Sequence, residues 1–134
     1  MKLNLSRLCY LVPGVVLIFG FTVVTNQEPW TVPDKAAKMP NPVKADAESL
    51  ATGKSLWSTH CASCHGKKGK GDGSKAAQLK THPIDFTSAD FHKQSDGALF
   101  YKTSEGKKDM PGFKKKLPDA DEIWSLVNYM RTLK

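Results

Sequence analysis

The sequence has few of the residues on which metal and redox-disulfide sites usually depend. Its 134 residues include only three cysteines, and Cys9 lies within an apolar N-terminal run. A tetrahedral zinc site needs four Cys or His ligands at matching spacing, and the other two cysteines lack such partners. The strand signal around Cys61 is weak, although a thioredoxin-like dithiol is expected in a βαβ pattern. Both kinds of site are therefore disfavoured.

Signatures of catalysis and of nucleic-acid binding are also missing. No arrangement of acid and base residues with a defined partner is visible, so we do not expect an enzyme. The formal net charge is +7, from 20 basic and 13 acidic residues, but no basic helix or aromatic-interleaved strand pair accompanies it. The charge favours a basic face on the protein rather than nucleic-acid binding.

The most informative stretch that is present runs from Cys61 to His65 and reads Cys-Ala-Ser-Cys-His. Two cysteines at this spacing can each add a thiol to a vinyl group of haem, and the next residue, His65, is then placed to ligate the iron. This is the attachment pattern of c-type haem. It occurs once, so we expect one covalent haem c held by Cys61 and Cys64.

Around this motif the chain resembles the class I cytochrome c family over about residues 46–134. The resemblance rests on the haem motif and on residues at family-like spacings: Gly53, Trp57, Met110, Pro111, Leu126 and Tyr129. It implies an all-α fold, the class I cytochrome c fold, in which a small helical domain surrounds one covalent haem. It also implies that Gly53 and Trp57 pack against the last helix, near Leu126 and Tyr129.

Residue patterns predict where these helices lie. Asp46 can cap a helix that continues to the haem motif, Ser95 or Asp96 can begin a short helix over 95–104, and Asp119 and Glu122 are spaced as a capping box for the last helix. Residues 74–80 are expected to form a helical turn. The glycine density of residues 66–73 predicts a loop that wraps the attachment site. Phe100 is expected to contact either the haem or the core.

The iron bound by His65 needs a second ligand or an open position, and Met110 is the best candidate. It lies in an inter-helical loop, followed by Pro111 and Gly112, whereas Met130 falls on the apolar stripe of the last helix. His82 and His92 remain as competitors, and His60 is too close to Cys61. The resemblance also implies a proline carbonyl that accepts a hydrogen bond from His65, and Pro83 is the candidate. Such an acceptor would orient the imidazole.

The N-terminal part is predicted to be an appendage of the domain. Lys2 and Arg7 precede an uncharged run over residues 8–25, which is near the minimum length for spanning a bilayer. An Ala-x-Ala cleavage site is absent, so we expect residues 1–25 to be a membrane anchor with an apolar helix; a cleaved signal peptide is the alternative. Residues 26–45 contain four prolines and predict an extended linker. The haem domain would then lie on the periplasmic side of the membrane.

The resemblance implies a one-electron carrier in an exported electron-transfer chain. Two alternatives stay open: a fixed subunit of a membrane respiratory complex, and a haem protein with an open distal site for ligands or catalysis. The two loops expected to flank the haem edge are rich in lysine, which predicts redox partners with an acidic docking surface. These lysines are Lys67, Lys68, Lys70, Lys107, Lys108, Lys114, Lys115 and Lys116.

Overall fold

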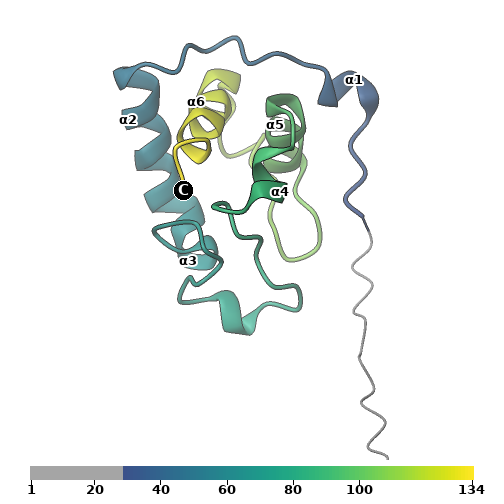
Figure 1. Cartoon of the computed structure of the whole chain (residues 1–134), viewed down its shortest axis with the longest axis vertical. Helices are drawn as coiled ribbons and strands as arrows, with labels where there is room; N and C mark the ends of the chain where they lie inside the picture. The colour runs from purple at the N-terminus through teal and green to yellow at the C-terminus, as the bar shows by residue number, and fades with distance from the viewer. Residues whose placement is uncertain (1–28) are drawn as a thin grey trace, which may run out of the picture.

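A computed structural model describes residues 29–134, and this part of the chain is helical without a strand. An isolated bridge between Lys107 and Met110 is its one β-like feature. The predicted all-α fold is therefore confirmed for the described residues (Figure 1). The elements, in chain order, are α1 Asp34–Ala37, α2 Ala47–Leu56, the π-helical turn η1 Trp57–Cys61, α3 Ala62–His65, the 3₁₀ turn η2 Ala76–Gln78, α4 Ala89–His92, α5 Asp96–Glu105 and α6 Ala120–Met130.

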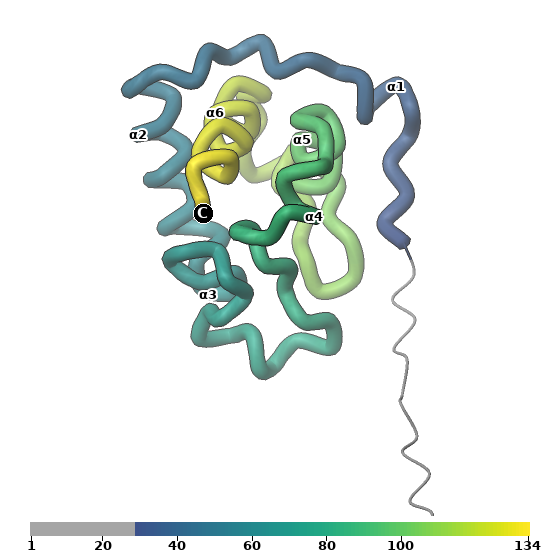
Figure 2. The backbone as a smooth tube through the Cα atoms, in the orientation of Figure 1, coloured from purple at the N-terminus to yellow at the C-terminus, as the bar shows by residue number. Residues whose placement is uncertain are grey.

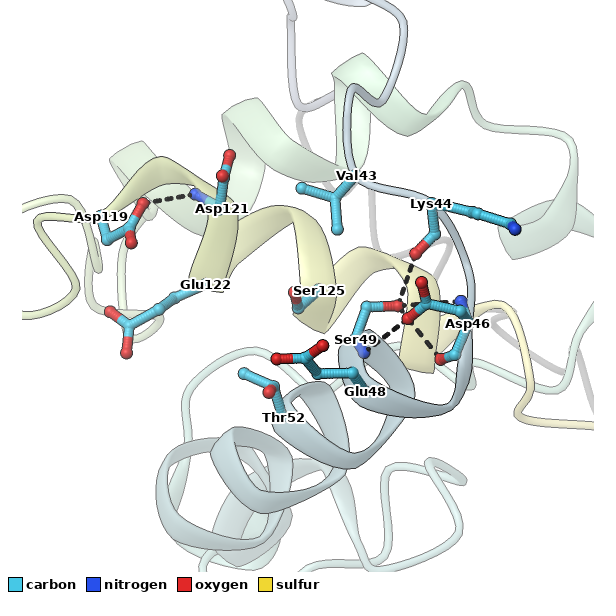
Figure 3. A pocket seen from close by; sticks show the side chains of 10 residues that line it. All are labelled: Val43, Lys44, Asp46, Glu48, Ser49, Thr52, Asp119, Asp121, Glu122 and Ser125. Atoms are coloured by element: carbon cyan, nitrogen blue, oxygen red, sulfur yellow. Dashed lines mark hydrogen bonds between the residues drawn. The ribbon is translucent and has the colours of Figure 1, made fainter.

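The start of α2 is fixed by Asp46, the predicted cap, which forms a capping box with Ser49. The Asp46 side chain accepts a hydrogen bond from the Ser49 amide at 3.0 Å, and the Ser49 hydroxyl accepts one from the Asp46 amide at 3.2 Å (Figure 3). Two amides that the first turn would leave unpaired are thus satisfied. At α6 the cap is Asp119, which accepts from the Asp121 amide. The capping box predicted for Asp119 and Glu122 is therefore wrong, because the Asp119 side chain accepts from Asp121 and no reciprocal bond from Glu122 is part of this cap.

Helices α2 and α6 cross in close contact beside the haem motif (Figure 1). A Cβ atom on Gly53 would lie 2.7 Å from the Tyr129 Cβ atom and nearer still to the carbonyl oxygen of Ser125. Glycine is therefore required sterically at the crossing, although it weakens a helix interior. The predicted packing of Gly53 against the last helix is confirmed.

The core is built on the apolar stripe of α6. Ile123, Leu126, Val127 and Met130 are all buried, at the intervals that place side chains on one helix face. Around them pack Trp57 of η1, Phe91 of α4 and Leu99 of α5. Phe100 stacks on Trp124 with 4.1 Å between ring centroids. It does not line the cavity described below, so of its two predicted roles the structure supports core packing.

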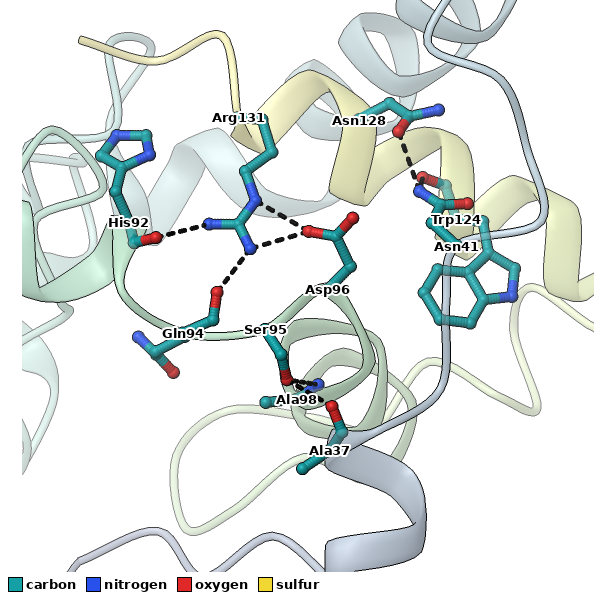
Figure 4. A network of polar contacts seen from close by, with 10 residues as sticks. All are labelled: Ala37, Asn41, His92, Gln94, Ser95, Asp96, Ala98, Trp124, Asn128 and Arg131. Carbon is teal, nitrogen blue, oxygen red and sulfur yellow. Dashed lines mark hydrogen bonds and ion pairs between the residues drawn. The ribbon is translucent and has the colours of Figure 1, made fainter.

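Residues 29–45, which are predicted to be part of an extended linker, pack against the helical domain. They include α1, which packs against α5, and they run across one end of the helices to reach α2 (Figure 2). The Ser95 hydroxyl donates to the Ala37 carbonyl at 2.6 Å, and Asn41 donates to Asn128 at 2.8 Å (Figure 4). The prolines keep much of this segment extended, as predicted, but tertiary hydrogen bonds fasten it to the domain. Residues 29–45 are therefore an extended segment that is held on the domain.

The C-terminal end of α6 is tied to the turn between α4 and α5. The Arg131 guanidinium donates to the Asp96 carboxylate at 2.8 Å and to the backbone carbonyls of His92 and Gln94 (Figure 4). The His92 ring also hydrogen-bonds the Leu133 carbonyl at 3.0 Å. These bonds hold α4 and α5 in place on the far side of the core from α2.

The predicted N-terminal apolar helix and anchor, residues 8–25, lie outside the described residues. Within residues 29–134, no helix has the length and apolar character needed to cross a membrane. The boundaries proposed at residues 25 and 45 stay predictions.

Candidate haem site

The haem motif lies where α2 continues into two short helical turns. The π-helical turn η1 ends at Cys61, and α3 then carries Cys64 and His65. A π-turn adds one residue to a helical turn and so re-aims the side chains after it, and such turns are common at functional sites. The chain leaves α3 at Gly66, whose φ of +82° favours glycine. Motif residues are thus presented from the end of a rigid helix.

The glycine-rich loop over residues 66–73 closes around the end of α3, as predicted. The amide of Gly71 donates to the His65 carbonyl at 2.9 Å, and that of Gly73 donates to the Cys64 carbonyl at 3.2 Å. These carbonyls would otherwise lack partners at the helix end. A Cβ atom on Gly71 would lie 2.6 Å from the Pro83 carbonyl oxygen, so the loop also packs directly on the Pro83 segment.

A cavity of about 400 Å³ adjoins the motif, within the size range typical of ligand and cofactor pockets. The structure brings all five residues predicted for the site to its wall: Cys61, Cys64, His65, Pro83 and Met110. The rest of the wall is largely apolar and aromatic, and includes Leu79, Ile84, Phe86, Phe91, Leu99, Phe113 and Met130. Such walls suit a flat, mainly apolar cofactor.

His65 is held between two aromatic rings. The centroid of its ring lies 5.8 Å from that of Trp57 and 4.9 Å from that of Phe86, which meets it edge-on. The Trp57 indole in turn donates to the Gly66 carbonyl at 3.1 Å. Burial lowers the pKa of His65 to about 4, although the nearby backbone of Ile84 opposes this shift. The imidazole is therefore neutral at pH 7, the form that binds metals.

The two nitrogens of His65 differ in their surroundings. Nδ1 is buried and has no hydrogen-bond partner of standard geometry, even though the Ile84 backbone influences the pKa of the ring. Since the side chain lines the cavity, Nε2 is the nitrogen available to an iron. Pro83, predicted to accept from this ring, is buried beside Ile84 in the same segment. Its hydrogen bond to His65 stays a prediction.

The cysteines do not have the properties of a redox dithiol. Burial, and to a lesser extent the neighbouring Cys64, raises the pKa of Cys61 to about 12. Reactive Cys-x-x-Cys pairs instead have a lowered thiol pKa. Among residues 29–134 no cluster of three or more His, Cys, Asp or Glu side chains is arranged to hold a metal ion by itself. The geometry thus favours haem attachment over both alternatives.

Met110 is presented by a tight hairpin that follows α5. The Lys107 amide donates to the Met110 carbonyl at 2.9 Å, and the Met110 amide donates to the Lys107 carbonyl at 3.0 Å. After the hairpin, the Phe113 amide donates to the Thr103 carbonyl, which attaches the returning chain to α5. The sulfur-bearing side chain of Met110 therefore reaches the cavity from a different part of the chain than the haem motif does.

The competing histidines are in different situations. His92 does not line the cavity and is bonded to the Leu133 carbonyl, which removes it as a ligand in this arrangement. His60 lines the cavity and has its ring 5.8 Å from that of Phe113. His82 also lines the cavity and is exposed. Met110 and His82 are therefore the side chains to compare as the second ligand.

Sequence reasoning missed the contribution of the N-terminal segment to this cavity. Pro29 and Trp30 line it, and the Lys102 ammonium lies 5.6 Å from the centre of the Trp30 ring. The Lys107 ammonium donates to the Pro29 carbonyl at 3.2 Å. No local pattern signals this, because the contact depends on how residues 29–45 pack on α5.

A second hollow, of about 340 Å³, lies between the starts of α2 and α6 (Figure 3). Its wall is polar and acidic, with Asp46, Glu48, Asp119, Asp121 and Glu122, and it includes none of the five predicted site residues. A mainly apolar cofactor does not suit such a wall. The candidate site is therefore the cavity beside the motif.

The residues present fit a covalent haem. Two thiols and a neutral imidazole from one short stretch meet a thioether at a single apolar cavity. Cys61 and Cys64 would hold the group covalently, His65 would ligate its iron, and the aromatic walls would cover its faces.

Comparison with known proteins agrees with this reading. The family described as "Cytochrome C oxidase, cbb3-type, subunit III" matches residues 48–130, which is more than half of the chain and includes the motif and Met110. No curated protein sequence matches the chain.

Among the solved structures that are similar to this chain, two illustrate the likeness. A chain of the Kuenenia stuttgartiensis reducing HAO-like protein complex Kustc0457/Kustc0458 is 26% identical, with a TM-score of 0.61 over 81% of this chain and 52% of that one. This chain thus spans about half the length of that relative. The KustC0563 c-type cytochrome is 31% identical, with a TM-score of 0.53 over 61% of this chain and 96% of that one. With the motif, the cavity and the family match in agreement, the chain belongs to the class I c-type cytochromes, which transfer electrons through covalently bound haem c.

Proposed function

We propose that the protein is a one-electron carrier in which His65 and Met110 are the axial ligands of a single haem c. The observation that supports this most directly is the shared cavity. It receives Cys61, Cys64 and His65 from the end of the first helix and Met110 from a separate hairpin. When bound, haem c supplies a one-electron iron couple.

The residues at the cavity would have separate parts in this function. His65 is neutral, because of its burial, and is held in orientation by the rings of Trp57 and Phe86. A thioether ligand such as Met110 favours reduced iron and raises the potential. A largely apolar wall would lower the local dielectric constant and so favour the less charged, reduced state. Two protein ligands leave no coordination position for oxygen or peroxide.

Substitution of the second ligand tests this assignment. Met110→Ala should abolish the near-infrared sulfur-to-iron band of the oxidised protein and lower the reduction potential. Met130→Leu is the matched control, because Met130 also lines the cavity but belongs to the core, and the band should survive this change. A band that persists in Met110→Ala and disappears in Met130→Leu would contradict the assignment. His82→Ala tests whether His82 is the second ligand instead, and we expect this variant to keep the band.

Covalent attachment has its own test. After extraction with acidified acetone, mass spectrometry should find haem on a peptide that contains Cys61 and Cys64. Haem that extracts completely would refute the attachment. Carbon monoxide should not bind the reduced native protein, because both axial positions are filled; rapid binding without denaturant would favour the open-site alternative.

A second candidate is a fixed electron-transfer subunit of a membrane complex. The family description names an oxidase subunit, and one structural relative is part of a protein complex. In this proposal residues 8–25 anchor the protein to the cytoplasmic membrane, with the haem domain on its periplasmic side. Co-purification with other haem proteins after mild detergent extraction would favour the fixed subunit. An N-terminus near Asn26 in the purified protein would instead indicate a soluble carrier.

For the one-electron carrier, we infer a redox partner that has an acidic docking surface. Lys107 and Lys108 line the cavity, and Lys115 and Lys116 are exposed shortly after the hairpin. In the glycine-rich loop, Lys67, Lys68 and Lys70 are exposed as well. Lys114 pairs with Glu105 at 2.7 Å, so it contributes less to the field than its neighbours. Complementary charge chiefly raises association rates.

A further inference from the structure

The hairpin that carries Met110 is fixed internally but needs other contacts to fix its place over the cavity. Its paired hydrogen bonds join Lys107 and Met110 to one another. Lys108, at its tip, has a φ of +54°, a conformation that costs a non-glycine residue some free energy. Bonds within a hairpin set its shape, whereas its position relative to the rest of the protein depends on bonds that leave it.

Asp109 makes such bonds. Its Oδ2 atom accepts hydrogen bonds from the amides of Lys80 at 2.8 Å and Thr81 at 3.3 Å. Lys80 lies 29 residues before Asp109 in the chain, and Thr81 lies 28 residues before it. One carboxylate oxygen thus joins the residue directly before Met110 to a distant segment. Bonds to a carboxylate are stronger than neutral ones.

The segment that Asp109 reaches is itself a wall of the haem cavity. Leu79, Thr81, His82 and Pro83 all line the cavity, and Pro83 packs on the loop that closes around the haem motif. The two amides lie in the segment that follows η2, outside any helix. Asp109 therefore connects the Met110 hairpin to the wall that faces the haem motif.

We propose that Asp109 is a positioning residue for Met110: its carboxylate fastens the methionine hairpin to residues 80–81 and so slows the departure of Met110 from the iron. This inference rests on the proposed function, because it takes Met110 to be the distal ligand. Asp109 also lines the cavity, and its proposed part is to hold Met110 rather than to bind the iron. The same bonds hold the segment of His82 in place, which keeps the competing imidazole at its exposed position.

The ligand-replacement rate of the oxidised protein measures this role. Imidazole can bind the iron only after Met110 has left, so at saturating imidazole the observed rate approaches the rate of methionine departure. Loss of two bonds to a charged acceptor would correspond to a change of about 100-fold or more at a buried position. The exposed location of Asp109 reduces this, so we expect a value of about 10-fold in Asp109→Ala.

Two variants separate positioning from general damage. Asp109→Asn keeps an oxygen that can accept from both amides, so its rate should remain near that of the wild type. Asp90→Ala is the matched control, since Asp90 is an exposed aspartate whose ion pair with Lys93 is local, and it should leave the rate unchanged. Equal rates in Asp109→Ala and Asp90→Ala would overturn the inference.

If Asp109→Ala does not fold well enough to be purified, hydrogen exchange in the unmodified holoprotein still tests the inference. The amides of Lys80 and Thr81 donate to the Asp109 carboxylate, so hydrogen exchange at both is expected to be slower than in an unstructured chain. Exchange as fast as in an unstructured chain would overturn the inference. A wild-type protein without the sulfur-to-iron band would overturn the proposed function and this inference with it. A normal band together with an unchanged rate in Asp109→Ala would overturn the inference alone.

Discussion

We predict that replacing Gly53 with alanine destabilises the crossing of α2 and α6. The new methyl group would lie 2.7 Å from the Tyr129 Cβ atom and 2.8 Å from the Ser125 carbonyl carbon. Both are well inside ordinary van der Waals contact of about 3.5–4.0 Å between carbons. The Ser125 atoms belong to the backbone of α6, so relief requires the helices to separate rather than a side chain to turn.

The expected magnitude follows from two opposing effects. Alanine gains about 1 kcal/mol over glycine within a helix. Overpacking of a close contact costs about 1–3 kcal/mol and sometimes more, and the contact with backbone places Gly53 at the upper end. The net loss in the free energy of unfolding is then about 2 kcal/mol. For a domain of this size that corresponds to a fall in Tm of about 8–16 °C.

Thermal unfolding of the haem-loaded protein, followed by circular dichroism, measures this loss. Ser55→Ala is the matched control, because Ser55 is exposed on the same helix and an exposed substitution changes stability by about 0.5 kcal/mol or less. If Gly53→Ala unfolds at or above the wild-type temperature while the control behaves as expected, the close crossing would be refuted.

Three further predictions concern other contacts. Trp57→Phe keeps a buried ring but removes the bond to the Gly66 carbonyl, so the free energy of unfolding should fall by about 1–3 kcal/mol in denaturant titrations; an unchanged midpoint would contradict this role. Arg131→Met removes the bonds to α4 and α5, and because these groups are partly exposed the loss should be about 1 kcal/mol by the same titration. Charge reversal at Lys115 and Lys116 should slow the second-order reaction with the redox partner, and the wild-type rate should fall as salt rises. A rate that is independent of salt in stopped-flow experiments would exclude electrostatic docking.

Local chemistry made much of the fold predictable. Asp46 and Ser95 cap their helices as expected, since a short polar side chain before an apolar repeat satisfies the first amides of a helix in almost any context. The stripe of α6 is buried because its spacing places four large apolar residues on one face. The glycine-rich loop is a loop because residues such as Gly66 and Gly71 adopt positive φ.

The segment before α2 shows where such reasoning fails. Its prolines indicate an extended chain, and much of it is extended, but proline content does not reveal what surface the chain lies on. The bonds from Ser95 to Ala37 and from Asn41 to Asn128 join residues 58 and 87 positions apart. For the same reason no local pattern around Trp30 indicated that this residue lines the cavity.

The haem motif could be recognised from local sequence, because Cys61, Cys64 and His65 are neighbours along the chain and their spacing allows attachment to haem. The place of Met110 in a loop between helices also indicated it as a candidate ligand. Which distant groups meet these residues depends on the tertiary structure. In the folded protein Met110 and His82 line the cavity, whereas His92 is hydrogen-bonded to the Leu133 carbonyl. The Asp109 carboxylate accepts hydrogen bonds from residues 80 and 81. Contacts of that range depend on the packing of whole helices, which no local pattern encodes.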